Sequence, residues 1–375
     1  MSEADAPFVA TDLAAIQAHA ADWDRLAAAM PLYIPSLADA TPLLDDPAIR
    51  LRLAGVQRGG TVACLMLFVV GRGPRGYWLG GRRLFSLSLR TARLFGPAAV
   101  GEASAAEVAA MFALVEAAGA IDLFTLDDLA DAGPLYPALA AGAVPGPRRL
   151  SQHNAARRLI DLPETMAGYW AMLRSNTRKT AQRDRRYFEA LAPTYRLYRG
   201  RDAIDAFLPA AAALSARTYQ QDIGLGLADT PAQRAQFARL AAADRLRCYL
   251  AFVGDVPVAF AWGDVSHGTF YFRMTGYDPD HGRHQAGKGM LFHVIEELIV
   301  SRAAQRFDFG VRDMAYKERF STRSVAAAHV LLGRWRRPRG LAAIAADRSL
   351  DAAKALAQRG LSGERLRRWR RRLRR

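Results

Sequence analysis

HQAGKGMLFHVIEEL, residues 284–298, joins a short polar loop to an apolar stretch. Gly287 and Gly289 stand in the loop, and Met290 and Val294 follow at helical spacing. The first N–H groups of a helix have no partner within the helix, and glycine lets a phosphate approach the backbone. The stretch therefore predicts a phosphate-binding loop that opens a helix. The alternative is a strand-to-helix turn in which the glycines serve only packing geometry.

The composition indicates a soluble chain with two domains. It has 375 residues, 51% of them hydrophobic, which is enough for buried cores. Cys64 and Cys248 lie in apolar strand-like runs, so we expect buried free thiols in a reducing cytoplasm. No His/Cys cluster has metal-ligand spacing, and we expect no metal. The N-terminus lacks a signal-peptide pattern, and the longest apolar run, residues 61–70, is about half the length that spans a bilayer.

The net charge of +16 is concentrated at the C-terminus. Residues 331–375 hold fifteen Lys/Arg and three Asp/Glu, a balance of +12, which leaves +4 for residues 1–330. We therefore expect no DNA binding by the body of the chain. The last twelve residues, ERLRRWRRRLRR, have eight arginines and one apolar stripe, a pattern that predicts contact between residues 361–375 and an anionic membrane surface. RNA binding and a disordered, solubilising tail are the alternatives.

The order of predicted elements repeats. The first half reads as helix 13–29, strands 50–57, 61–71 and 76–87 with a turn at 71–76, helix 104–119 and strand 121–129. The second half reads as strand 157–162, one long helix 165–191, strand 194–200, helices 202–220 and 230–244, strands 247–254, 256–265 and 269–278, a helix to about residue 304, strand 306–310 and a helix from 314. We predict domains at 1–145 and 146–335, followed by a basic helical tail at 336–375.

This order resembles the GNAT acyltransferase fold. Four segments carry the likeness: 173–186, 270–280, the HQAGKG loop, and FDFGVRDMAYKERF at 307–320. They are similar to the CelD-like acetyltransferase domains of polysaccharide and cell-envelope biosynthesis in bacteria. These domains are similar in turn to the FemAB-type aminoacyltransferases, which contain two GNAT-like domains. The resemblance implies an α/β fold, with a mixed α+β sheet, in which two GNAT-like domains stand in tandem, the N-terminal one degenerate, ahead of the basic tail.

The resemblance also implies the donor and its site. The acyl group of acetyl-CoA or another acyl-CoA would be delivered at the loop residues His284, Gly287, Lys288, Gly289 and Met290. In the GNAT loop the first position is usually Gln or Arg, and this chain has histidine there. FemAB-type members use aminoacyl-tRNA instead, so this donor is the alternative.

Three residues near the end of the matched region are the predicted catalytic groups. By resemblance, Tyr316 protonates the leaving thiolate and Lys317 stabilises the oxyanion. Asp308 would orient Lys317, deprotonate the acceptor or form a structural ion pair. The alternatives are a core tyrosine at 316 and a surface lysine at 317 that pairs with Glu318 or Asp313. The candidates for a general base are weak, because each fits a turn at least as well: Asp264, His267 and Asp278.

A basic row on the first helix of the matched region is the predicted acceptor site. Arg174, Arg178 and Arg186 recur at multiples of four residues and suit the phosphates of a nucleotide sugar or a lipid-linked sugar. Tyr219 would line the acceptor cleft. The alternatives are a solvated helix face and core packing of the tyrosine.

Together these features predict a cytoplasmic acyltransferase that acts on a small-molecule or glycan-precursor acceptor, peripheral to the inner face of the membrane. The first alternative is a FemAB-like transferase that takes its acyl group from charged tRNA. The second is a GNAT-derived module that binds an acidic glycan or lipid without catalysis.

Overall fold

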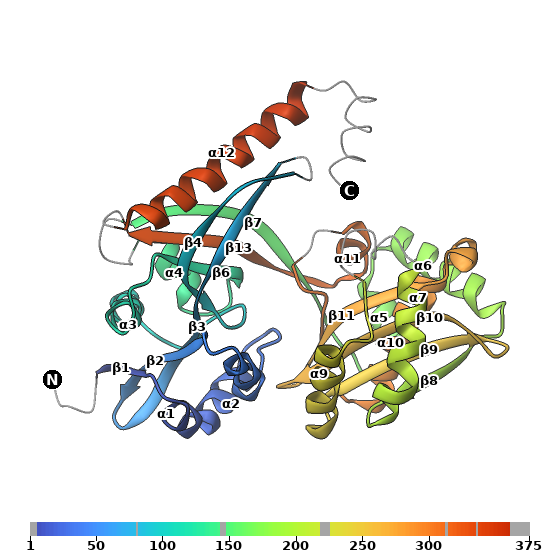
Figure 1. The fold of residues 1–375 in the computed structure, drawn as a ribbon. Helices are drawn as coiled ribbons and strands as arrows, with labels where there is room; N and C mark the ends of the chain where they lie inside the picture. The colour runs from blue at the N-terminus through green and yellow to red at the C-terminus, as the bar shows by residue number, and fades with distance from the viewer. Residues whose placement is uncertain are drawn as a thin grey trace. The chain divides into compact units, whose positions relative to one another are not determined.

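The computed structural model describes residues 6–79, 82–142, 148–217, 226–311, 314–334 and 337–360. The chain forms two compact units. The first unit consists of residues 1–157 and 325–375, and the second consists of residues 158–324. Each unit is a mixed β-sheet with helices packed on it (Figure 1), which confirms the predicted α/β fold class.

The first unit contains β1 (Pro7–Ala10), α1 (Leu13–Ala18), α2 (Ala20–Ala28), the 3-10 helix η1 (Leu37–Asp45), β2 (Arg50–Arg58), β3 (Thr61–Leu79), β4 (Arg82–Leu94), β5 (Val100–Gly101), α3 (Ala105–Ala117), β6 (Leu123–Ala130), α4 (Leu135–Ala140), most of β7 (Arg148–Asp161), most of β13 (Arg323–Arg334) and α12 (Pro338–Gly360). Its strand order is β1-β2-β3-β4-β6-β13-β7, with β5 on β3. β4 and β6 are parallel.

The second unit contains α5 (Met166–Met172), α6 (Ser175–Glu189), β8 (Thr194–Tyr198), the π-helical turn η2 (Ala203–Phe207), α7 (Leu208–Ala216), α9 (Pro231–Ala242), β9 (Leu246–Val253), β10 (Val256–Ser266), β11 (Thr269–Tyr277), the 3-10 helix η3 (Pro279–His284), α10 (Ala286–Ser301), β12 (Arg306–Asp308) and α11 (Ala315–Phe320). Its strand order is β7-β12-β11-β10-β9-β8, and β11 and β12 are parallel.

Both units repeat one motif, an antiparallel strand pair, a helix and a strand parallel to the second of the pair. The motif is β3–β4–α3–β6 in the first unit and β10–β11–α10–β12 in the second. The strand after each motif pairs within the other unit: residues 159–161 of β7 pair with β12, and residues 327–333 of β13 pair with β6. The tandem arrangement predicted from the sequence is therefore present, with an exchanged strand in each unit.

The apolar face of α10 lies in the main core of the second unit. Met290, Val294 and Leu298 are completely buried there, together with Phe307 on β12 and Phe270 on β11. Full burial of each such side chain stabilises the fold by about 1.5–3 kcal/mol. The helical face predicted from the spacing of Met290 and Val294 is confirmed. Both cysteines are free and buried, as predicted.

Two predicted helices and one predicted turn differ from the structure. The helix expected at 165–191 is divided into α5 and α6, because Leu173 and Arg174 adopt extended ψ angles of 147° and 142°, and Leu173 is buried. The helix expected at 13–29 is divided at His19. The turn expected at 71–76 is part of β3, which continues to Leu79.

The domain limits predicted from the sequence, 1–145, 146–335 and 336–375, stay predictions. The compact units divide the chain after residues 157 and 324, and most of β13 belongs to the first unit. α12 lies inside the predicted basic tail, whereas residues 361–375 lie outside the described residues.

Candidate active site

The N-terminus of α10 is open. Gln285 precedes the helix in the left-handed conformation, with φ 61°, and its side chain makes no capping hydrogen bond. The N–H groups of Lys288 and Gly289 both donate to the carbonyl oxygen of Gln285, each at 2.9 Å. Within the described residues the N–H groups of Ala286 and Gly287 have no acceptor. Ala286 is completely buried, so only the N–H of the half-buried Gly287 is open to an anion.

The two glycines of the loop lie against aromatic rings. A Cβ atom on Gly287 would lie 2.7 Å from Cδ1 of Tyr277, and one on Gly289 would overlap the ring of Phe188. Gly289 is thus needed for the close packing of α10 on α6, as the packing alternative states. Gly287 also serves packing, but its N–H group stays uncovered.

Lys288 forms an ion pair with α6. Its Nζ atom lies 2.6 Å from Oδ2 of Asp184, whose side chain is 4% exposed. A buried carboxylate needs such a partner, so Lys288 neutralises Asp184 in this structure. His284, in the first position of the loop, is half-buried, and its Nδ1 atom has no hydrogen-bond partner.

β11 and β12 pair over only three residues. The parallel pairing begins at Thr269 and Arg306 and ends at Tyr271 and Asp308, whereas β11 continues to Tyr277. Directly after the last pair the chain turns at Gly310, with φ 71°. Asp308 is completely buried, and its Oδ1 atom accepts a hydrogen bond from the N–H of Gly310 at 2.7 Å. Asp308 therefore shapes the turn at the point where the two strands part.

Lys317 lies against this same turn. It is 7% exposed, and its Nζ atom donates to the carbonyl oxygen of Phe309 at 2.5 Å. The side chain is therefore buried, unlike the surface lysine of the alternative interpretation. Tyr316 is half-buried and packs its ring on Phe309, 6.1 Å between centroids, as a core tyrosine does. Their catalytic roles stay predictions.

A buried charge network beside the turn was not predicted as a unit. Tyr271 pairs with Asp308 in the sheet, and its hydroxyl lies next to Gly310. The guanidinium of Arg273 lies 4.6 Å above the Tyr271 ring, and its Nε atom is 2.6 Å from Oδ1 of the buried Asp264. The alternation Phe-Tyr-Phe-Arg at 270–273 is a signal that could have placed Tyr271 and Arg273 on one face.

The three candidate bases have other partners or fit turns. Both oxygens of Asp264 are bound by arginines, Arg245 at 3.0 Å and Arg273 at 2.6 Å. Asp278 accepts from the N–H of Asp280 in η3 and is paired with Arg217 at 2.6 Å. His267 occupies the β10–β11 turn with φ 46°. These observations favour structural roles for all three.

The arginine row lies on α6. Arg174 and Arg186 are exposed and Arg178 is half-buried. Among the described residues, none of the three has an acidic side chain within 4.0 Å. By contrast, Arg185 is bound by Glu189 and Glu296. The three predicted arginines are thus available to an anion, whereas Tyr219 lies outside the described residues.

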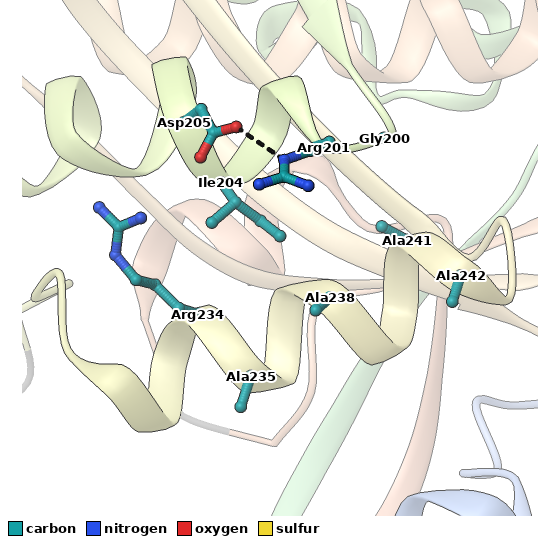
Figure 2. Close-up of a pocket in the computed structure, with 9 residues that line it drawn as sticks. All are labelled: Gly200, Arg201, Ile204, Asp205, Arg234, Ala235, Ala238, Ala241 and Ala242. Atoms are coloured by element: carbon teal, nitrogen blue, oxygen red, sulfur yellow. Dashed lines mark hydrogen bonds and ion pairs between the residues drawn. The ribbon is translucent and has the colours of Figure 1, made fainter.

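The structure has a cavity of about 660 Å³ elsewhere in the second unit (Figure 2). It lies between the start of the η2–α7 helical segment and the alanine-rich face of α9. The two arginines at its rim are paired with carboxylates, Arg201 with Asp205 at 3.2 Å and Arg234 with Asp229 at 2.6 Å. No residue of α10, β11, β12 or α11 lines the cavity, so it is separate from the groups described above.

Two absences hold for the described part of the chain. It contains no cluster of three or more His, Cys, Asp or Glu side chains that could hold a metal ion. None of its helices is both long enough and apolar enough to cross a bilayer.

Residues 175–318 match the family model described as acetyltransferase (GNAT) domain. This span runs from the start of α6 into α11 and includes the open end of α10 and Lys317. No curated protein matches the chain in sequence.

Solved structures share the fold of most of the chain. The chain is similar to the crystal structure of FemX, with 11% identity and a TM-score of 0.55, over 85% of this chain and 96% of that one. It is also similar to a conserved protein of unknown function from Bacteroides thetaiotaomicron, with 12% identity and a TM-score of 0.52, over 84% and 97% of the two chains. Most of the second unit, residues 175–318, therefore matches the GNAT acetyltransferase domain model, and the chain shares the fold of FemX.

Proposed function

We propose that the second unit transfers an acyl group to an amine or hydroxyl of a cell-envelope or polysaccharide precursor. The donor would be acetyl-CoA or another acyl-CoA. The observation that carries the proposal is the open N-terminus of α10 in a region that matches the GNAT domain model. In the same region α11 places the buried Lys317 against the turn that follows β12.

The donor site fits a diphosphate. The N–H group of Gly287 has no acceptor and stands at the positive end of a helix dipole, and the first turn of α10 contains no acidic residue. Lys288, in the same turn, stays in its ion pair with Asp184. It would therefore attract a phosphate only through its charge at a distance, without direct contact.

The chemical step requires stabilisation of an oxyanion and a proton for the leaving group. The acceptor attacks the thioester carbonyl, and the ammonium of Lys317, held at the Phe309 carbonyl, stabilises the negative oxygen. Asp308 holds the turn on which Lys317 rests. Tyr316 would supply the proton to the departing thiolate.

The acceptor is expected to carry phosphate. Arg174, Arg178 and Arg186 offer three guanidinium groups without acidic partners among the described residues, and guanidinium binds phosphate through two parallel hydrogen bonds. A nucleotide sugar or lipid-linked sugar meets this requirement. The predicted attachment of residues 361–375 to the inner face of the bacterial membrane would bring the enzyme to such a substrate.

Two other functions are separated from this one by the donor. A FemAB-like enzyme would bind aminoacyl-tRNA in place of coenzyme A, and a binding module would have no donor. The fold shared with FemX keeps the tRNA-dependent alternative open, whereas the uncapped end of α10 favours a diphosphate.

The test is calorimetry with coenzyme A and acetyl-CoA on two matched variants. Gly287→Ala and Gly287→Glu both place a Cβ atom against Tyr277, but only glutamate adds a carboxylate beside the open donor. We expect Gly287→Glu to weaken coenzyme A binding at least about tenfold relative to Gly287→Ala. The glutamate carboxylate would repel the phosphates of coenzyme A and would occupy their place at the helix N-terminus. Absence of heat with the unmodified protein at millimolar ligand would overturn the acyl-CoA proposal, and binding of charged tRNA would then support the FemAB-like one.

A further inference from the structure

β3 and β4 extend beyond the sheet of the first unit as a two-stranded ribbon. β3 pairs with β2 up to Val70, and β4 pairs with β6 from Thr91. Between these points residues 71–79 and 82–90, named the arm here, pair with each other. Such a hairpin is marginally stable by itself, so its faces need further contacts.

α12 supplies these contacts on one face of the arm (Figure 1). The hydroxyl of Tyr77 donates to the carbonyl oxygen of Ala343 at 3.1 Å, and Arg75 lies 3.5 Å from Asp347. Tyr77 is buried by this packing.

The other face of the arm, named the outer face here, is exposed. Cross-strand partners point to the same face, so Arg72 lies opposite Arg90, and Trp78 lies opposite Arg83, away from Tyr77. All four side chains are exposed. The intervening residues of this face are exposed as well: Pro74, Gly76, Ser86 and Ser88.

The charge of the arm has one sign. Residues 71–90 contain five arginines and no Asp or Glu. Like charges directly opposite each other destabilise a ribbon. In the part of the chain that the structure describes, the guanidinium groups of Arg72 and Arg90 form no ion pair within 4.0 Å, and the Asp122 carboxylate accepts from the backbone N–H of Arg90 at 2.9 Å. An external anion at this pair would therefore stabilise the arm.

The end of the arm is apolar. Trp78, Leu84 and Phe85 are 54%, 52% and 43% exposed, unusually high for large apolar side chains. Tryptophan and phenylalanine beside arginine are typical of surfaces that enter the headgroup region of a bilayer. RNA binding by ring stacking is less favoured, since Phe85 already stacks on Tyr77 at 4.7 Å and Leu84 has no ring.

We propose that the arm docks on an anionic bilayer surface. Trp78 on the outer face and Leu84 at the end of the arm enter the boundary between headgroups and acyl chains, and Arg72 and Arg90 bind lipid phosphates. Phe85 pairs with Tyr77 and lies on the face of the arm toward α12. This membrane contact is a function separate from acyl transfer, and it does not depend on residues 361–375.

Flotation of the full chain with vesicles of phosphatidylglycerol and phosphatidylcholine tests the proposal. Arg72→Gln/Arg90→Gln should lower the partition coefficient about 30-fold, because each basic residue at an anionic surface contributes a factor of about five. The control Arg239→Gln/Arg302→Gln removes the same charge from exposed sites of the second unit and should change it less than threefold. Equal partitioning of both double variants would overturn the proposal.

A second readout follows the apolar end of the arm. Bromine-labelled lipids should quench part of the tryptophan fluorescence of the unmodified protein, and Trp78→Phe should remove that part. If Arg72→Gln/Arg90→Gln lost RNA binding but kept vesicle binding, the ligand of the arm would be a nucleic acid and not a lipid surface. Every variant keeps the basic tail, so the differences report on the arm alone.

Discussion

The two units differ at the same place in the same motif. In the first unit α3 begins with a closed end: Ser104 accepts from the N–H of Glu107 at 3.3 Å, and Glu107 accepts from the N–H of Ser104 at 2.6 Å. Glu107 also binds Arg58 at 2.7 Å. In the second unit α10 begins at the uncapped, left-handed Gln285.

The difference supports the proposal that the second unit, and not the first, binds the phosphates of the donor. In the first unit the capping box occupies the N–H groups of Ser104 and Glu107 and places the Glu107 carboxylate in the first turn of α3. The hydrogen bond from Arg58 is the largest cause that lowers the pKa of this carboxyl group, to about 2. A phosphate would be repelled. In the second unit the first turn of α10 has no acidic side chain and the N–H of Gly287 has no acceptor, at a cost in stability that a capping side chain would avoid. Duplication of the motif thus yields one closed scaffold and one open site.

Substitution of Lys317 should have the largest effect on the difference between the two units. The segment after β6 in the first unit, residues 131–142, contains no lysine, so the buried ammonium belongs to the second unit alone. Lys317→Met should lower the turnover number about 100-fold or more, because an oxyanion-stabilising donor is lost, while coenzyme A binding stays within about twofold. Steady-state kinetics and calorimetry measure the two effects. Lys354→Met, in α12 of the first unit, is the control, and turnover of Lys317→Met within a factor of two of the unmodified protein would contradict the role.

Sequence was sufficient for the motif and its loop because local rules determine them. The spacing of Met290 and Val294 fixes the buried face of α10, and glycine followed by a helix predicts the turn. Phosphate binding by the loop stays a prediction: the N–H of Gly287 has no acceptor, whereas those of Lys288 and Gly289 donate to Gln285, and Gly289 serves packing on Phe188. Which N–H groups at the start of α10 remain without an acceptor depends on the carbonyl that accepts each of the others, and the local sequence does not determine this.

The rest required pairing between distant segments. β13 was not predicted as a strand, and its place beside β6 follows from an exchange that no local pattern records. Tyr271, Arg273 and Asp264 meet because β10, β11 and β12 align in one register. The arm was read as a turn at 71–76 because glycine and proline mark turns in isolation, whereas pairing with β4 extends β3 through them.

Two histidines should give the two units opposite dependences of stability on pH. Burial lowers the pKa of His293 on α10 to about 4 from 6.5, so the unfolded chain binds the proton more tightly. Stability of the second unit should therefore fall as pH decreases from 6.5 to about 4. The hydrogen bond to Asp127 instead raises the pKa of His329 in the first unit, and its contribution is fully present below pH 6.5 and lost as pH rises through the raised pKa.

The measurement is hydrogen exchange of the amides of α10 and β13 as a function of pH. His293→Gln should flatten the loss of protection in the second unit between pH 6.5 and about 4. His329→Gln should remove the low-pH gain of the first unit and leave the second unit unchanged. The same pH dependence in His293→Gln and in the unmodified protein would show that the imidazole is not the responsible group.

The smallest expected effects concern the two helix starts themselves. Ser104→Ala removes a cap and should lower the free energy of unfolding by about 1 kcal/mol. Gln285→Gly should raise it by up to about 1 kcal/mol, because glycine adopts φ 61° without the steric cost of a side chain. Urea denaturation measures both changes, and opposite signs are the result expected if the first helix start is built for stability and the second for a ligand. A loss of stability in Gln285→Gly would mean that the glutamine side chain holds the turn, and the start of α10 would then be closed in the same sense as that of α3.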